Sequence, residues 1–578
     1  MFRQNNQHLQ RSFLSDINNL TEKARADLER SWAGVFYREF FSRLDERPFA
    51  VLYSDKASRP NVPINVLVGL EMFKSGFGWS DAELYDHFRF DVQVRYALGL
   101  RALGEGEFEL RTLYNFRQRL SEHRAETGED LLGQAFAQVT DEQIKAFQLQ
   151  TRCMRMDSTQ VASNICRMTR LQLLVEMLQR VHRMLSPADR ARYEEAFAPY
   201  LKGTSGQYIY HIRNEETAPH MEQIGHLMQR LLAELAPTYA DHVTYQLLQR
   251  VFAEQFDLVE SSVQVKSGQD ISPSRLRSPD DPEATFRRKG SEEYEGYVAN
   301  ITETCVADNP FQLITKVQTA PNIVEDATLL VEALPELKAR TDVDVLYNDA
   351  GFCSAQADEA LREHQVTQVP TDLRGHAPNP DKFNLADFDI HTDEQGQPTQ
   401  VTCPQGQTVS VEVGRKATRC LAHFGASQCA TCPSRDKCVT QIRKRDGRRT
   451  LRFDQRQMDV AQRRRRCIAY HQAGKNPRAG VEATVGAVKR PWPDGQLPVR
   501  GLFRMGALLL GSAAMVNIRR IVRYEATKRP PERPQAGLMG PENGAEKSDL
   551  SFVSLLRHWL QCLFWLPKRP QPAVALNW

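Results

Sequence analysis

The stretch that decides the fold is YEGYVANITETCVADNPFQLITKVQTAPNIVEDATLLVEALPELKARTDVDVLYND, residues 294–349. Its first half alternates apolar and polar residues with the period of two that strands show, in two successive hairpin-like runs. Leucines then recur at helical spacing in ATLLVEALPEL, and a further strand-like run, VDVLYND, ends on Asp349. Two strands, a helix and another strand predict an α/β layer.

Two more acids stand out. In RCMRMDSTQVASN we expect a strand that ends on Asp157, before small polar residues follow. Open α/β sheets bind ligands at the C-terminal ends of their strands, so neighbouring strands could present Asp157 and Asp349 together. Glu482 lies in NPRAGVEATVGAVKR, where three- and four-residue spacing places it on one helical face with Arg478 and Lys489.

Three carboxylates from separate segments suit the chemistry of phosphodiesters. Cutting or transferring a phosphodiester needs charge compensation on the attacking and leaving oxygens, which two divalent ions about 3.5–4 Å apart supply. Mg²⁺ takes few protein carboxylates and keeps several waters, so three acids suffice. Arg478 and Lys489 would then hold phosphates on either side of Glu482. The alternative is a helix surface with spaced ion pairs, and each acid taken singly is more often structural.

The rest of the chain alternates helical and irregular stretches. Apolar residues recur at helical spacing in the N-terminal region, and a helix predicted there carries Arg117 and Arg119, a basic face for DNA phosphates; a solvated surface helix is the alternative. The predicted divisions are a helical N-terminal DNA-binding domain (1–150), an α/β core (151–375) with a helical insertion (about 168–262), a Cys-rich, basic insert (376–470), a C-terminal part of the core (471–530), and a linker with an amphipathic tail (531–578).

Composition narrows the class of protein. The chain has 578 residues, of which 41% are hydrophobic and 25% charged, which predicts a multidomain globular protein. Its net charge of +3 does not by itself predict a polyanionic partner, and its odd number of cysteines, 11, argues against a disulfide framework. We read no signal peptide, and the longest apolar run, Met505 to Ile518, is too short to cross a bilayer. These features predict a cytoplasmic protein without a membrane partner, and a buried core helix at that run.

The motifs together resemble bacterial insertion-sequence transposases of the DDE class. The resemblance rests on MDST around Asp157, YNDAGF around Asp349, and Arg478, Glu482 and Lys489 with three and six intervening residues. Residues 278–321 also look like the family's core strands. The stretch from YSDKASRP to TLYNFRQRL is similar to the helical domain at the start of InsH-type transposases. One departure is Lys475, which stands where related signatures have Tyr.

The resemblance implies a ribonuclease H-like catalytic core in which Asp157, Asp349 and Glu482 hold two Mg²⁺ or Mn²⁺ ions. The expected reaction is cleavage of transposon ends by water, followed by strand transfer that uses a DNA 3′-hydroxyl. The expected partner is double-stranded DNA, both the terminal inverted repeats and the target. A homodimer is expected on DNA because two transposon ends must be brought together.

The insert at 376–470 is expected to be small and irregular, because its periodicity is weak and its apolar content thin. A tetrahedral zinc site would replace a core there, and the family resemblance favours Cys403, Cys429, Cys432 and Cys438 as its ligands. Cys420 and His423 are alternative ligands, and reduced thiols without metal are the other interpretation. The basic residues that follow are candidate DNA contacts, with a solvated charge run as the alternative: Lys444, Arg448, Arg449, Arg463, Arg464, Arg465 and Arg466.

Two rival functions share these features. A nuclease with the same metal core would cut DNA without strand transfer. A zinc-containing DNA-binding regulator, or an inactive transposase derivative, would bind DNA without metal-dependent cutting.

Overall fold

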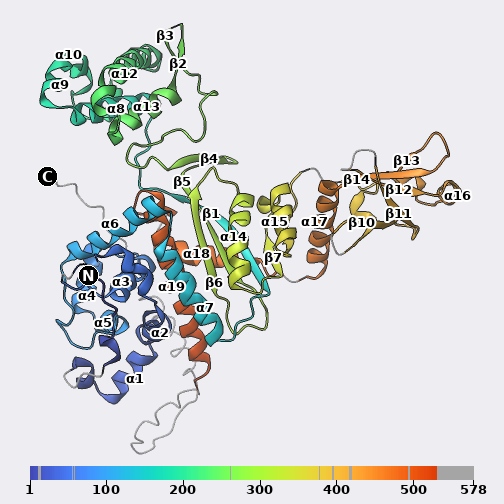
Figure 1. Cartoon of the computed structure of the whole chain (residues 1–578), viewed down its shortest axis with the longest axis horizontal. Helices are drawn as coiled ribbons and strands as arrows, with labels where there is room; N and C mark the ends of the chain where they lie inside the picture. The colour runs from blue at the N-terminus through green and yellow to red at the C-terminus, as the bar shows by residue number, and fades with distance from the viewer. Residues whose placement is uncertain are drawn as a thin grey trace, which may run out of the picture. The chain divides into compact units, whose positions relative to one another are not determined.

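A six-stranded mixed sheet, here called the core sheet, carries two of the predicted acids. Its strands are β1 (Cys153–Ala162), β4 (Thr285–Lys289), β5 (Glu292–Thr304), β6 (Ile314–Pro321), β7 (Val345–Asn348) and β8 (Thr367–Pro370). Their order is β4-β5-β1-β7-β8, with β6 paired to β5 (Figure 1). β1 runs antiparallel to β5 and parallel to β7, and β7 runs parallel to β8. The α/β class with a mixed sheet is therefore confirmed.

The computed structural model describes residues 1–529 except 11–14, 55, 57–58, 261, 376–377, 394–395, 415–418, 475 and 493–494. Met1–Thr527 form one compact unit. Lys475 and the predicted linker and tail at 531–578 lie outside the described residues.

The segment that decides the fold forms the expected elements. Its two strands are β5 and β6, its helix is α14 (Asp326–Arg340), and its last strand is β7, followed by α15 (Ala355–Glu363). Alternate residues of β1, Met154 and Met156, pack against apolar residues of α14 in a buried cluster. Because side chains alternate across a strand, Arg155 and Asp157 then face the opposite side of the sheet.

β1 is longer than predicted. It was expected to end on Asp157, but it continues to Ala162 because that half stays paired with β5, from Asp157 opposite Ile301 to Ala162 opposite Gly296. The polar residues after Asp157 hid this pairing from the sequence pattern. Only the parallel pairing with β7 stops before Asp157.

The N-terminal region is helical, as predicted. Its helices are α1 (Glu22–Arg30), α2 (Trp32–Glu39), α3 (Ile64–Phe77), α4 (Asp81–Phe90), α5 (Val92–Ala97), α6 (Leu110–Thr127) and α7 (Leu131–Ala146). Gly78, with φ of 73°, ends α3 in the left-handed conformation that favours glycine. These helices share one buried cluster with the core sheet and with α19 (Leu502–Thr527), which packs against α3.

The helical insertion after β1 is also present. It contains α8 (Arg170–Met184), α9 (Pro187–Arg192), α10 (Glu194–Phe197), α11 (Ser205–Tyr210), α12 (Thr217–Tyr239) and α13 (Val243–Gln255), then the hairpin β2 (Phe256–Val259) and β3 (Ser262–Val265) (Figure 1). Its leucines and methionines form a buried cluster of their own. The insertion therefore carries its own hydrophobic core.

The Cys-rich insert differs from the expectation of an irregular segment. It is a six-stranded antiparallel sheet, here called the insert sheet: β9 (Asp389–Thr392), β10 (Pro398–Thr402), β11 (Thr408–Val413), β12 (Arg419–Phe424), β13 (Gln441–Ile442) and β14 (Arg449–Asp454), with the short helix α16 (Ala426–Ala430). Phe388, Val401, Phe424 and Phe453 are among the residues of its small buried core. The strands escaped prediction because they are short and half of each faces solvent.

Three helices complete the described chain: α17 (Gln455–Gln472), α18 (Ala479–Lys489) and α19. The predicted core helix at Met505–Ile518 lies within α19 and is buried. By length and composition alone α19 could cross a membrane, but 72% of its most apolar window is buried inside the protein, as in the core helices of soluble proteins.

Candidate active site

The register of two parallel strands brings two predicted acids together. Arg155 of β1 lies opposite Tyr347 of β7. Counting two residues further along each strand reaches Asp157 and Asp349, at the point where the pairing ends. Backbone pairing therefore sets these two carboxylates side by side, as expected for the C-terminal edge of a parallel strand pair.

Asp157 is buried at the centre of this arrangement. Its side chain accepts a hydrogen bond from Nη2 of Arg478 at Oδ1, over 3.0 Å, and a second from the backbone N–H of Ser158, over 3.1 Å. Burial raises the pKa of the Asp157 carboxyl; Arg478 opposes the rise and the neighbouring Asp349 adds to it. A second cation at this point would relieve both the burial and the repulsion between the acids.

Asp349 follows β7 and caps the short 3₁₀-helix η7 (Ala350–Phe352). Its Oδ1 accepts the backbone N–H of Gly351 over 2.7 Å, which fixes the carboxylate. A Cβ added to Gly351 would lie 2.7 Å from that Oδ1 and 2.5 Å from Oδ2 of Asp326. Glycine is therefore needed for the close approach of the turn to both carboxylates.

Arg478 connects Glu482 to the aspartate pair. The acid lies in the first turn of α18, which packs on β1, and its side chain is 65% exposed. Nη1 of Arg478 lies 3.2 Å from Oε1 of Glu482, while Nη2 binds Asp157. Arg478 thus bridges the strand-borne and helix-borne acids, and its own pKa is raised by Asp157, Asp349 and Glu482 against the effect of burial.

The donor chemistry at this site fits hard divalent cations, which take carboxylate oxygens. Within the described residues, however, no group of three or more His, Cys, Asp or Glu side chains converges closely enough to hold a metal ion as it stands. Asp157 and Asp349 already lie together, whereas the exposed Glu482 is held by Arg478. A metal site therefore requires Glu482 to turn inward, and the exposure of its side chain leaves it room to do so.

Lys489, the last residue of α18, binds the edge of β1. Its Nζ donates to the carbonyl of Gln160 over 3.0 Å and lies 3.3 Å from Oγ1 of Thr159. Burial lowers the pKa of this ammonium. In this conformation Lys489 anchors the helix that carries Glu482, and its predicted phosphate contact stays a prediction.

Three arginines of the predicted DNA-binding run on α17 are engaged within the fold. Arg463 pairs with Asp358 over 3.0 Å, and Arg465 pairs with Asp389 over 2.8 Å. Arg466 lies 3.3 Å from a backbone carbonyl of β8. These contacts connect α17 to α15, to the core sheet and to the start of the insert sheet, and DNA contact by these arginines stays a prediction.

Arg464 differs from its neighbours. With Arg452 of β14 and Arg456 of α17 it lines a cavity of about 570 Å³ between the insert sheet and α17. Three guanidinium groups around one opening make a site where a phosphate backbone could bind.

The basic residues of α6 also divide into two kinds. Arg117 lies 2.7 Å from Glu71 and 2.8 Å from Asp81, so it closes an ion pair inside the helical region. Arg119 is exposed, with its guanidinium 4.9 Å from the ring centroid of Tyr53. Of these two, Arg119 is the one placed where DNA could reach it.

The cysteines of the predicted zinc site lie near one another, but among the described residues no three of them converge closely enough to hold a metal ion. Burial raises the pKa of the Cys429 thiol; Cys438, Cys403 and Cys432 add to the rise, and Arg449 opposes it. The alternative ligand His423 lies 2.9 Å from Oγ1 of Thr450. Zinc binding by Cys403, Cys429, Cys432 and Cys438 stays a prediction.

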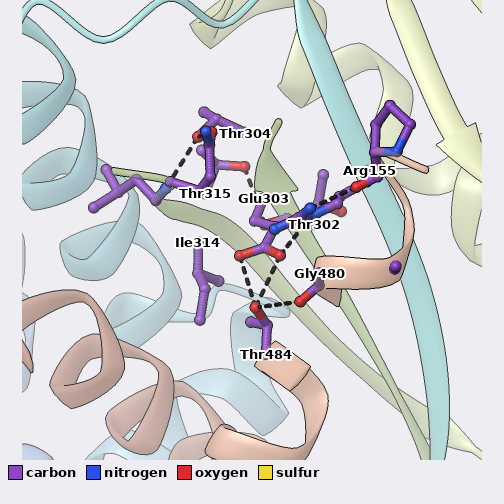
Figure 2. A network of polar contacts seen from close by, with 12 residues as sticks. Arg155, Thr302, Glu303, Thr304, Ile314, Thr315, Gly480 and Thr484 are labelled. Atoms are coloured by element: carbon purple, nitrogen blue, oxygen red, sulfur yellow. Dashed lines mark hydrogen bonds and ion pairs between the residues drawn. The ribbon is translucent and has the colours of Figure 1, made fainter. Parts of the chain in front are cut away.

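A buried polar cluster behind the acids escaped sequence reasoning. Figure 2 shows Glu303 of β5 meeting Arg155 and Thr484 next to Gly480 of α18. Glu303 has no solvent exposure. A charged residue inside the strand-like run VANITET was the signal that could have indicated such a contact, because buried charges are almost always paired.

Residues 402–522, about a fifth of the chain, match the family model of a transposase DDE domain. This segment is similar to a transposase DDE domain. The match runs from the insert sheet through α18 to α19, so the matched segment contains Glu482 and Arg478, while Asp157 and Asp349 precede it. It confirms the resemblance to DDE-class transposases, whereas the similarity to the InsH-type N-terminal domain stays a prediction. No curated protein and no solved structure matches the chain significantly.

Proposed function

We propose that this protein is an insertion-sequence transposase that cleaves transposon ends and transfers them into target DNA. The observation that carries the proposal is the parallel register of β1 and β7, which sets Asp157 beside Asp349 and leaves Glu482 one arginine away. The transposase DDE domain match that contains Glu482 supports it. The mixed core sheet, with β7 and β8 parallel to β1, supports a ribonuclease H-like core.

The three acids would hold two Mg²⁺ or Mn²⁺ ions. Bound there, the ions would polarise the scissile phosphate and activate the attacking oxygen. Asp157 and Asp349 are fixed by strand register and by the cap of η7, so they supply the rigid half of the site. Glu482 would supply the third ligand, and its exposed side chain has room to turn toward the ions.

Arg478 has a second part in this proposal. Its Nε is buried and has no hydrogen-bond partner within the described residues. A buried donor without an acceptor is costly, and a DNA phosphate oxygen is an acceptor of the right charge. With cations bound to the acids, Arg478 would be free to bind a phosphate oxygen beside them.

The proposal extends to partners and location. We infer that double-stranded DNA binds across the site, that two copies of the chain act together on two transposon ends, and that the protein works in the cytoplasm. The zinc site of the insert sheet is proposed on the proximity of Cys429 to the other three cysteines.

The test is cleavage of DNA that carries the element's own ends, with Mg²⁺ or Mn²⁺. We expect the unaltered chain to nick or cut at the ends, and Asp349→Ala to cleave about a thousandfold more slowly, because removing a metal ligand forfeits several kcal/mol of transition-state stabilisation. Binding of the ends in EDTA, measured by mobility shift, should persist in Asp349→Ala.

Three outcomes contradict the proposal. Full cleavage by Asp349→Ala would show that the acids are structural. Tight binding without any metal-dependent cleavage by the unaltered chain would instead favour a DNA-binding regulator. Cleavage without joining to a supercoiled target would indicate a nuclease.

A further inference from the structure

Glu303 is a buried carboxylate that ties three elements together. It belongs to β5, and its Oε1 accepts from Nε of Arg155 on β1 over 2.7 Å. The hydroxyl of Thr484, on α18, lies 2.8 and 2.9 Å from its two oxygens. Nη1 of Arg520, on α19, donates to Oε2 over 2.7 Å. Figure 2 shows Arg155 and Thr484 approaching the carboxylate from the strand and the helix.

The cluster joins residues that lie close in sequence to Asp157, Arg478 and Glu482. Arg155 lies two residues before Asp157 on the same face of β1, and Thr484 lies two residues after Glu482. Nη1 of Arg155 also donates to the carbonyl of Pro477, the residue before Arg478. The same guanidinium therefore holds the sheet and the start of α18.

α18 needs a glycine to come this close. A Cβ added to Gly480 would lie 2.3 Å from Nη1 of Arg155 and 2.5 Å from its Cζ. A Cβ added to Gly486, on the same helix, would have no atom within 4 Å. The close approach is thus confined to the turn of α18 that carries Glu482.

We propose that Glu303, Arg155 and Thr484 are positioning residues that set the distance between Glu482 and the aspartate pair. The inference rests on the proposed function and names how its site is held. A buried ion pair contributes little net stability, because desolvation of the charges offsets their attraction. The ion pair instead fixes the position of α18 relative to β1. This matters because a metal site requires its ligands within about 0.5 Å of the productive geometry.

The matched pair Thr484→Val and Thr484→Ser tests this inference in the full chain. Valine keeps the shape and removes the hydroxyl, whereas serine keeps the hydroxyl and removes the methyl group. Three quantities are measured: Mn²⁺ binding, by the electron paramagnetic resonance signal of free Mn²⁺; the melting temperature without metal; and end-DNA binding in EDTA. None of the three requires cleavage.

We expect Thr484→Val to bind Mn²⁺ about 10- to 100-fold more weakly, the usual cost of losing a residue that orients a metal ligand. Its melting temperature should fall by only a few degrees, because the change removes one hydroxyl while Arg155 and Arg520 still pair with Glu303. Its affinity for end DNA should be unchanged, and Thr484→Ser should bind Mn²⁺ within about threefold of the unaltered chain, because its hydroxyl keeps the contact with Glu303.

A second pair covers the case in which Thr484→Val does not fold. Gly480→Ala pushes against Arg155 and should also weaken Mn²⁺ binding by about tenfold, whereas Gly486→Ala, in open space, should not.

Two results overturn the inference: Mn²⁺ binding by Thr484→Val equal to that of the unaltered chain, or equal losses in Thr484→Val and Thr484→Ser. If the unaltered chain binds Mn²⁺ but does not cut end DNA, the proposed function fails while the Mn²⁺ comparison still decides the positioning role.

Discussion

The core sheet and the insert sheet both have six strands, yet they place their candidate functional side chains differently. In the core sheet, the parallel pairing of β1 with β7 brings Asp157 and Asp349 to one edge from positions far apart in the sequence. In the insert sheet every pairing is antiparallel, so the candidate ligands lie at turns and short helices: Cys403 follows β10, and Cys429 lies in α16.

The two sheets differ in how many buried contacts hold the candidate side chains in place. The core sheet is packed against helices on both faces, in clusters that include α14 on one side and the N-terminal helices and α19 on the other. The insert sheet has only a small cluster around Phe388 and Phe424. Backbone register therefore places Asp157 beside Asp349, whereas the cysteines would need the proposed zinc ion to hold them in place.

The largest effect should come from removing the zinc ion that we propose for the insert sheet. Structural zinc contributes on the order of 10 kcal/mol in small domains, far more than a few buried side chains. We expect about one zinc per chain by elemental analysis, and loss of it in Cys429→Ser. Limited proteolysis should then cut within 376–470 while the rest of the chain stays resistant.

The control is Cys166→Ser, since Cys166 is exposed and lies outside the insert. Protein purified without zinc whose insert resists protease as well as before would show that the small core alone holds the insert sheet.

In the core sheet, the position of Asp349 should depend on the turn at Gly351. Gly351→Ala places a Cβ within 2.7 Å of Oδ1 of Asp349 and 2.5 Å of Asp326. A misplacement of about 1 Å at a reacting centre can cost a hundredfold in rate, so end cleavage should slow by about that factor. Single-turnover cleavage measures the effect.

Gly268→Ala is the matched control, because its added Cβ has no atom within 4 Å. Equal cleavage rates in the two variants would show that the turn at Gly351 does not position Asp349.

The sequence predicted the core sheet far better than the insert sheet. The run that became β5 has 13 residues and is largely buried, so its apolar pattern was strong. β6 has eight residues and begins with two buried ones, and the four residues of β7 alternate buried and half-buried positions. Asp349 was placed correctly at the end of β7 because that alternation is typical of a strand. The strands of the insert sheet carry alternating exposed residues with few apolar ones, as in β11, TVSVEV, and their pattern was too weak to read.

Long-range contacts limited what the sequence could show of the site. Nothing local indicates that Arg478 bridges Asp157 and Glu482, or that Glu303 meets Thr484, because these pairs lie far apart in the chain. The run Arg463 to Arg466 was predicted to contact DNA as a block, but a helix points four successive side chains in different directions. Three of them reach partners within the fold.

The smallest effect on DNA binding should distinguish two neighbouring arginines of α17, Arg463 and Arg464. Arg464 opens onto the cavity shared with Arg452 and Arg456, whereas Arg463 is paired with the buried Asp358. Arg464→Gln should lower the slope of log K against log salt for end-DNA binding by about one and leave the melting temperature unchanged.

Arg463→Gln should do the reverse, destabilising the fold by about 3 kcal/mol because Asp358 is left buried without its partner, with the salt slope unchanged. Fluorescence anisotropy across a salt series, with thermal unfolding of the same samples, measures both. If the two variants lose salt dependence equally, the whole arginine run contacts phosphate, and α17 belongs to the DNA-binding surface rather than to the joint between the sheets.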